Sequence, residues 1–355
     1  MLGQRLHQAR KSAGLSLRDL SEKTCVTAMA ISKYERNEST PSSGVLLDLA
    51  KVFEVRVEYF FRQIEVELKT INYREHEKLP NTEETKILAD VKEQLERWIA
   101  LEEFLPTPWS TAYKIPTRLP TKINTYDDIE NVALKVRKSW DLGIRPILDL
   151  MDMLESKGIK VFITKYDEHK HFNGLSATIN RDPVMVVGQH WLGDRQRFTL
   201  ARELGRCVVK GHLAKEINEE KACHRFAGAF LVPKPKVLNH LGQHRTWLEP
   251  QELYSLKHEY GLSMEGWIDR AKDLGILPKQ HADKVCGYFR KQGWMKTEPG
   301  QPYRAETTRL FEQLVYRALA EDMVSESKAA ELLGMSLVAL HAYRNMECYD
   351  DVVNL

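Results

Sequence analysis

The sequence predicts a multidomain protein with an all-α N-terminal domain, followed by an α+β domain that carries a helical C-terminal tail. Apolar residues recur at helical spacing over residues 1–62, and residues that break helices separate the short runs. Segments of strand type and helix type alternate over residues 126–240, and helical spacing returns over residues 241–355. Residues 63–125 are predicted as a connector with one short strand and one charged helix.

The composition is that of an ordinary globular protein. The formal net charge is only +2, so any affinity for DNA must come from a local basic patch. Five scattered cysteines without a Cys-x-x-Cys pair argue against a disulfide framework and against a thiolate zinc knuckle. The N-terminus lacks the apolar core of a signal peptide, and no apolar run approaches the ~18 residues that cross a membrane. We therefore expect a cytoplasmic protein without a membrane partner.

The N-terminal domain is predicted to consist of five short helices. The first ends at Gly14, because glycine readily adopts the left-handed backbone found after helix ends. Ser16 and Thr27 are suited to begin the second and third helices, since a hydroxyl oxygen can accept a hydrogen bond from a free amide of the first turn. An apolar helix follows over residues 45–53, and aromatic residues over 59–61 close the domain.

Residues 15–37 read LSLRDLSEKTCVTAMAISKYERN, and the apolar run VLLDLAKVF follows Pro41. This stretch resembles the Cro/phage-repressor (XRE) family of helix-turn-helix proteins, and the resemblance covers about residues 1–62. Cys25 and Asn37 depart from the family, which often has glycine there, but asparagine tolerates a left-handed backbone. The resemblance implies that the third helix enters the major groove of double-stranded DNA.

The expected DNA contacts lie on the second, third and fourth helices, away from the face that carries Ile31 and Tyr34: Arg18, Thr27, Ala28, Met29, Ser32, Lys33, Arg36 and Ser43. Ala28 and Met29 favour contact with thymine methyl groups, and Lys33 is suited to donate to guanine. Arg18 and Ser43 are expected to meet phosphates. Seven basic and three acidic side chains give residues 1–36 a local net charge of +4. Arg10 and Glu35 are instead expected to form a structural ion pair, and some motifs of this kind mediate only protein contacts.

A second resemblance lies in RFTLARELGRCVV at residues 197–209 and EKACHRFAGAFLVP at 220–233, preceded by the strand pattern FNGLSATI. These segments resemble the ImmA/IrrE family of zinc peptidase-like domains, and the C-terminal half is similar to regulators that fuse an XRE domain to this module. In that family the first helix carries His-Glu-x-x-His, whose two histidines bind zinc and whose glutamate activates a water. An acidic third ligand comes from the next helix.

In this sequence the motif is degenerate, because Arg202 and Arg206 stand at both histidine positions. Glu203 remains at the general-base position, and Glu220 matches the downstream carboxylate. Arginine has no free lone pair and stays protonated, so it cannot ligate zinc. The resemblance therefore implies a retained fold with no metal, no cofactor and no enzymatic activity. We expect the arginines to form salt bridges with the two glutamates in place of the metal.

Several alternatives remain for this site. The arginines either brace two helices or bind a small anionic effector or a partner's carboxylate in the former cleft. A rescued zinc site would have to use nearby His212, Cys223 or His224, while Cys207 lies on another face of the helix. An active zinc metallopeptidase coupled to a DNA-binding domain is the main alternative function, and an interaction scaffold without DNA sequence preference is another.

The C-terminal region offers weaker signals. Residues 284–304 resemble the RxGW…EP stretch of the same regulator group. Residues 325–344, SESKAAELLGMSLVALHAYR, have the rhythm of a helix-turn-helix. A second DNA reader is one interpretation, but the acidic residues Glu321, Asp322 and Glu326 favour a helical cap or a dimerisation element. No internal repeat stands out along the chain.

Together, the two resemblances imply a transcriptional regulator, a repressor in the first instance, with a pseudo-metallopeptidase domain that senses an effector or binds a partner. Such repressors bind palindromic operators as homodimers, because two recognition helices then meet two half-sites one DNA turn apart. The resemblance also allows an antitoxin role, in which a cognate toxin docks on the C-terminal domain.

Overall fold

The computed structural model describes residues 2–53, 55–61, 66, 68–75, 81–105, 122–165, 172–179 and 182–346. The chain divides into two units, each assembled from separate stretches of sequence. The first unit contains Met1–Leu68, Lys78–Ser110 and Arg309–Leu355, and the second contains Lys69–Glu77 and Thr111–Thr308. Among the described residues, no helix combines the length and the apolar character needed to cross a membrane.

The first unit begins with the expected short helices: α1 (Leu2–Ser12), α2 (Leu17–Lys23), α3 (Ala28–Glu35), α4 (Ser43–Val52) and the 3-10 helix η1 (Val57–Phe61). Ser16, Thr27 and Ser42 cap α2, α3 and α4, each accepting a hydrogen bond from a backbone amide of the first turn. Their apolar faces share one core that includes Leu20 and Ile31. The helical N-terminal domain predicted from the sequence is confirmed.

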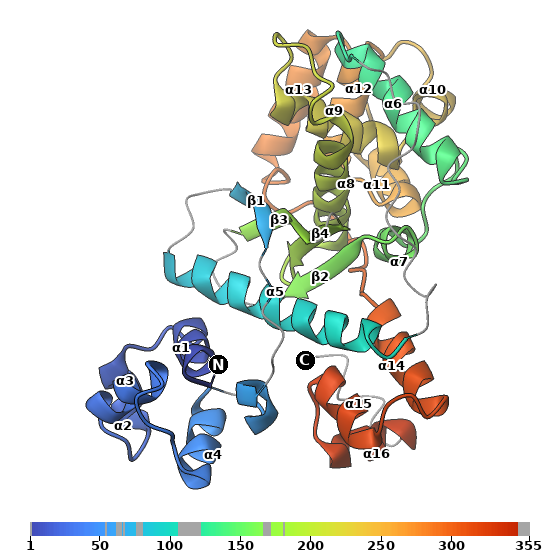
Figure 1. The fold of residues 1–355 in the computed structure, drawn as a ribbon. Coiled ribbons are helices and arrows are strands. Elements are labelled where there is room, and N and C mark those ends of the chain that lie inside the picture. The colour runs from blue at the N-terminus through green and yellow to red at the C-terminus, as the bar shows by residue number, and fades with distance from the viewer. Residues whose placement is uncertain are drawn as a thin grey trace. The chain divides into compact units, whose positions relative to one another are not determined.

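The first unit also contains a long helix and the end of the chain. Helix α5 (Asn81–Glu102) buries the stripe of Ile87, Val91 and Leu95, and Figure 1 shows it in cyan. The helices α14 (Leu310–Ala320), α15 (Glu326–Leu333) and α16 (Leu337–Arg344) follow much later in sequence. Arg5 of α1 pairs with Glu96 of α5 at 2.7 Å, and Trp98 of α5 stacks on Phe311 of α14 at 5.3 Å between ring centroids. Helix α5 therefore contacts both ends of the chain.

The second unit is built around a small mixed sheet. Among the described residues this sheet has four strands in the order β1-β3-β4-β2. Strands β3 (Phe172–Ile179) and β4 (Asp182–Gly188) form an antiparallel hairpin, and β2 (Lys160–Thr164) lies parallel to β4. Strand β1 (Lys69–Glu75) pairs antiparallel with β3.

Helices surround this sheet and fill the rest of the unit: α6 (Tyr126–Ser139), α7 (Leu150–Ser156), α8 (Gly193–Val209), α9 (Glu219–Leu231), α10 (Lys234–Leu241), α11 (Pro250–Tyr260), α12 (Met264–Asp273) and α13 (Lys279–Lys291). Helix α8 packs on β3 and β4 and runs beside α9 (Figure 1). One apolar core joins α6 through α13, with Trp267 fully buried in it. The predicted α+β architecture is confirmed.

The division into units differs from the boundaries expected at residues 63–125 and 241–355. The expected connector does not form a region of its own, because α5 lies in the first unit and β1 in the second. Strand β1 supplies hydrogen bonds to the edge of β3, and the apolar stripe of α5 needs helices on which to pack. Residues 241–308 likewise belong to the α+β unit, whereas α14 to α16 belong with the N-terminal helices. Residues 106–121 of the expected connector lie outside the described residues.

Candidate functional site

The outward face of α3 is the candidate DNA-binding surface. Thr27 caps α3, with its Oγ1 accepting a hydrogen bond from the Ala30 amide at 3.2 Å. All residues of α3 are described, and Ile31 alone among them is fully buried. The remaining side chains of this helix are thus exposed or half-buried. The side chain of Met29, near the start of the helix, is 71% exposed.

The eight residues predicted to contact DNA all lie at the surface or close to it. Six are exposed: Arg18, Thr27, Met29, Lys33, Arg36 and Ser43. Ala28 and Ser32 are half-buried. Arg36 is engaged locally, because its Nη2 lies 3.1 Å from Glu38 and its Nε donates to the Ser32 carbonyl oxygen. A phosphate would therefore compete with Glu38 for this guanidinium.

An ion pair fixes α3 against α1. The Nε of Arg10 lies 2.6 Å from one oxygen of Glu35, and its Nη2 lies 2.8 Å from the other. Burial opposes ionisation of Glu35, but hydrogen bonds from Arg10 and His7 outweigh it and lower the pKa of this carboxyl below its ordinary value. Arg10 and Glu35 therefore form the structural pair that the sequence suggested.

The residues that the sequence resemblance aligns with a zinc motif form a connected group of ion pairs. Arg202 and Arg206 of α8 each place an Nη2 atom 2.5 Å from a different oxygen of Glu220, at the start of α9. Arg206 also donates from Nη1 to Glu203 at 2.6 Å. The hydroxyl of Ser176, on β3, donates to the same Glu203 oxygen at 2.6 Å. The expected pairing of arginines with glutamates is thus present, and we call these five residues the arginine cluster.

The members of the arginine cluster differ in their access to solvent. The side chain of Glu203 is completely buried, whereas that of Glu220 is 58% exposed. Burial disfavours the charge of Arg206, but Glu203, Cys223 and Glu220 together raise its pKa above the ordinary value. Arg206 is therefore a permanent cation, and it occupies an oxygen that a general base at Glu203 would need.

The residues that the resemblance aligns with zinc ligands do not fit zinc. Two guanidinium groups repel a divalent cation and offer it no lone pair. Burial raises the pKa of Cys223 to about 12 and that of Cys207 to about 11, so both thiols are protonated at neutral pH. His224 is exposed and its ring lies against Phe198. Within the described residues, no group of three or more His, Cys, Asp or Glu side chains is placed to hold a metal ion.

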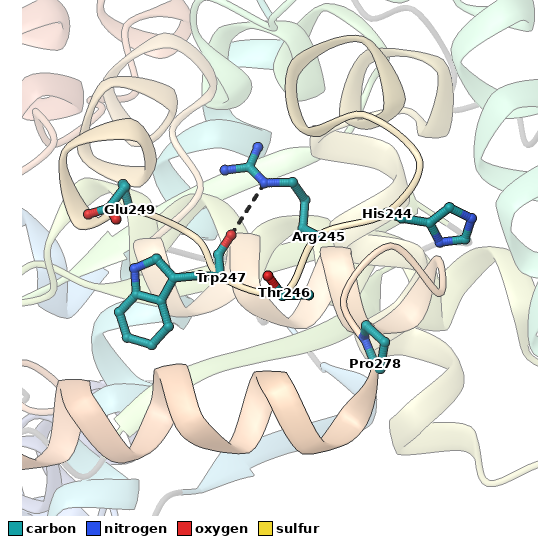
Figure 2. A pocket seen from close by; sticks show the side chains of 6 residues that line it. All are labelled: His244, Arg245, Thr246, Trp247, Glu249 and Pro278. Carbon is teal, nitrogen blue, oxygen red and sulfur yellow. Dashed lines mark hydrogen bonds between the residues drawn. The ribbon is translucent and has the colours of Figure 1, made fainter.

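A separate cavity of about 480 Å³ lies beside the loop between α10 and α11. Figure 2 shows the side chains that line it: His244, Arg245, Thr246, Trp247, Glu249 and Pro278. The guanidinium of Arg245 is held by Glu252 at 2.7 and 3.0 Å and by the carbonyl of Trp247 at 3.3 Å. The cavity therefore gains no free positive charge from this arginine.

Two residues that stabilise buried charges could not be identified from the sequence. Ser176 bonds Glu203 from a strand whose spacing carries no sign of that contact. Glu96 neutralises the buried Arg5 across a long stretch of sequence. Only the tertiary arrangement brings either pair together.

Comparison with known proteins identifies two domains in the chain. Residues 6–60 match the family model described as a helix-turn-helix, and residues 154–271 match the model described as an IrrE N-terminal-like domain. The second match begins and ends later than the expected domain of residues 126–240. The two resemblances found in the sequence are thereby confirmed.

Two curated relatives each match less than a fifth of the chain. Over 68 residues the chain is 34% identical to the HTH-type transcriptional regulator ImmR of Bacillus subtilis (strain 168), which covers 19% of this chain and 54% of that protein. Over 64 residues it is 36% identical to an uncharacterized transcriptional regulator in the ATPase CF(0) region of Rhodospirillum rubrum, with 18% and 59% covered. The matches thus span little more than half the length of these relatives.

Proposed function

Because the chain joins a helix-turn-helix domain to an IrrE N-terminal-like domain, we propose that it is a sequence-specific DNA-binding transcriptional regulator whose second unit has lost peptidase activity. The single observation that carries the proposal is the outward face of α3, which presents Met29 and Lys33 to solvent. An α-helix with this exposure fits the major groove, where side chains near its N-terminus meet base edges.

The surroundings of α3 support DNA reading. The local net charge of +4 over residues 1–36 supplies the attraction to phosphates that DNA binding requires. Arg18 and Ser43 begin neighbouring helices, where they and the free amides of the first turn can meet the backbone. The pair of Arg10 with Glu35 holds α3 in place, so the helix meets DNA as a rigid element. We expect two copies to bind a palindromic operator in the cytoplasm.

The arginine cluster supports the loss of peptidase activity. Zinc peptidases need a metal that lowers the pKa of a bound water and a carboxylate that takes its proton. Here Arg206 holds both Glu203 and Glu220, so these carboxylates serve as its counterions. The cluster braces α8 against α9. A small anionic effector or a partner's carboxylate would have to displace Glu220, the exposed residue of the arginine cluster. Stabilising the contact between α8 and α9 is therefore the favoured role of the cluster.

Repression and an antitoxin role both remain compatible with this architecture. In either case α3 finds the operator, and the second unit offers a surface to an effector or to a cognate toxin. The two roles differ in one observable property. An antitoxin forms a stable complex with the product of a neighbouring gene, whereas a repressor alone does not.

The proposal is tested by titrating the full chain with duplexes that it selects from a random pool, at one fixed salt concentration. Met29→Ala and Lys33→Ala should each cost about 1–3 kcal/mol of binding and relax the preference at one base position. Lys296→Ala is the matched control, because this lysine is exposed in the second unit. Equal affinities for all three variants and the parent chain would remove α3 as the recognition helix.

A further inference from the structure

The last two helices, α15 and α16, resemble the helix-turn-helix of the N-terminal domain. Residues 16–35, SLRDLSEKTCVTAMAISKYE, and residues 325–344, SESKAAELLGMSLVALHAYR, align without a gap. Ser16 and Thr27 cap α2 and α3, and Ser325 and Ser336 cap α15 and α16 at the same spacing. Each cap oxygen accepts from the amide three residues on, at 3.1–3.2 Å.

The buried positions repeat in the same register. Leu20 and Ala329 occupy one aligned core position, and Ile31 and Leu340 occupy the other, all of them fully buried. The turns differ: α15 ends on the left-handed Gly334, with φ of 72°, whereas α2 ends one aligned position earlier, on the extended Thr24, with φ of -132°. Glycine adopts this left-handed backbone without strain. Local geometry therefore makes α15 and α16 a second helix-turn-helix.

The two motifs also expose an apolar side chain at the same place. Met29 of α3 aligns with Val338 of α16, and their side chains are 71% and 80% exposed. In α3 this position faces the bases in the proposed function. A strongly exposed apolar residue at the start of a helix is suited to contact thymine methyl groups in the major groove.

Both motifs are anchored in the first unit. The turn before α16 is held by Arg56, whose Nη1 donates to the carbonyl of Met335 at 3.1 Å. Trp98 of α5 stacks on Phe311 of α14, and the same helix binds α1 through Glu96. A duplex held by the first motif is therefore present at high effective concentration for the second.

The charges of the second motif differ from those of the first. Residues 309–346 carry five acidic and four basic side chains. Arg317 pairs with Glu321, Lys328 pairs with Glu331, and Arg344 pairs with Glu326, which also faces His341. Such a motif adds little attraction to phosphates, so alone it would bind DNA weakly. Its contribution is expected from contacts with bases on a duplex that the first motif already holds.

We propose that α16 is a second DNA-reading helix, which contacts base pairs beside the site read by α3. This inference rests on the proposed function, because the first motif must deliver the duplex. A protein-docking role for the same apolar surface is the competing outcome of the test below.

The test uses three variants of the full chain, each with one exposed apolar residue replaced by glutamate. The measurement is the footprint of each variant on duplexes selected from a random pool. Val338→Glu should shorten the protected stretch from one side and weaken binding about tenfold, a cost of about 1.4 kcal/mol. Met29→Glu should abolish specific protection. Leu148→Glu is the control, since Leu148 is 79% exposed in the second unit. All three should unfold at the temperature of the parent chain.

The outcomes separate the two claims. If the footprint of Val338→Glu is identical to that of Leu148→Glu, α16 is not a second DNA-reading helix. The same conclusion follows from a change of oligomeric state at Val338 with an unchanged footprint, which would make α16 a protein-docking helix. If Met29→Glu also leaves the footprint intact, the proposed function itself fails.

Salt dependence provides a second measurement. Val338→Ala removes no charge, so it should weaken binding while leaving the slope of log affinity against log salt unchanged. Arg18→Ala, at an expected phosphate contact, should reduce that slope by about one. A changed slope for Val338→Ala would contradict the proposed base contact.

Discussion

At the scale of single residues, Arg206 decides the chemistry of the second unit. Its guanidinium bonds the buried Glu203 and the exposed Glu220, at a position where the resemblance to the ImmA/IrrE family implies a histidine. A buried carboxylate is tolerable only with a cation beside it. Arg206 therefore disfavours metal binding and also stabilises the buried carboxylate of Glu203.

Replacing Arg206 should thus be costly. Arg206→Met leaves Glu203 buried with a hydroxyl partner but no cation, and should lower the free energy of unfolding by about 3–5 kcal/mol. Arg202→Met is the matched control, because Arg202 bonds only the exposed Glu220 among these carboxylates, and should cost about 1 kcal/mol. Urea denaturation of the full chain measures both. Equal losses of unfolding free energy in the two variants would show that the buried Glu203 does not depend on Arg206.

Glu35 gives the first unit a dependence on pH. Its folded pKa lies below the ordinary value of 4.5, so the pair with Arg10 adds stability above that pH. The added stability should disappear as pH falls through the folded pKa. Glu35→Gln should therefore lower the melting temperature at pH 7 and change it less at pH 3. Hydrogen exchange of the α3 amides between pH 3 and pH 7 measures this dependence. If the protection of these amides changed with pH in the same way in the variant and the parent chain, the prediction would be contradicted.

At the scale of elements, the close approach of α8 and α9 depends on a residue without a side chain. A Cβ atom at Gly205 would lie 2.9 Å from Cδ1 and 3.1 Å from Cβ of Phe226, on α9. The ring cannot move away easily, because Phe226 is fully buried and stacks on Phe230. The geometry of the arginine cluster therefore depends on glycine at this position.

Two glycine substitutions should change the stability of the second unit in opposite directions. Gly205→Ala should destabilise the second unit by about 1–3 kcal/mol, because it overpacks the interface of α8 and α9. Gly287→Ala lies on α13 with open space around the added methyl group, and should stabilise by up to about 1 kcal/mol. Melting temperatures of the two variants measure the difference. Stabilisation by Gly205→Ala would mean that the two helices are not in close contact.

The elements also show what the sequence could and could not predict. Caps such as Ser16 and Thr27 act on amides three residues away, so the helices of the first motif could be located from local pattern alone. The partner of β1 could not, because β3 lies about a hundred residues further along the chain. The helix-turn-helix rhythm of residues 325–344 can be recognised in the sequence, but its repetition of residues 16–35 is obscured because Leu20 is replaced by Ala329 and Cys25 by Gly334. The aligned caps and buried positions reveal it.

At the scale of the whole molecule, the chain combines a unit suited to read DNA with a unit that retains a peptidase fold. The first unit carries the exposed face of α3 and is closed by the last three helices of the chain. The second carries the arginine cluster at the position of a metal. The central claim is that this unit is held together by guanidinium groups and serves regulation.

The zinc content of the purified, untagged full chain tests this claim most directly. Plasma mass spectrometry after dialysis against zinc-containing buffer should find well below one zinc ion per chain, because Arg202 and Arg206 exclude the metal. The chain should still bind its selected duplex under the same conditions. About one zinc ion per chain, at the occupancy of a true tetrahedral site, would contradict the account and restore peptide hydrolysis as the activity to be sought.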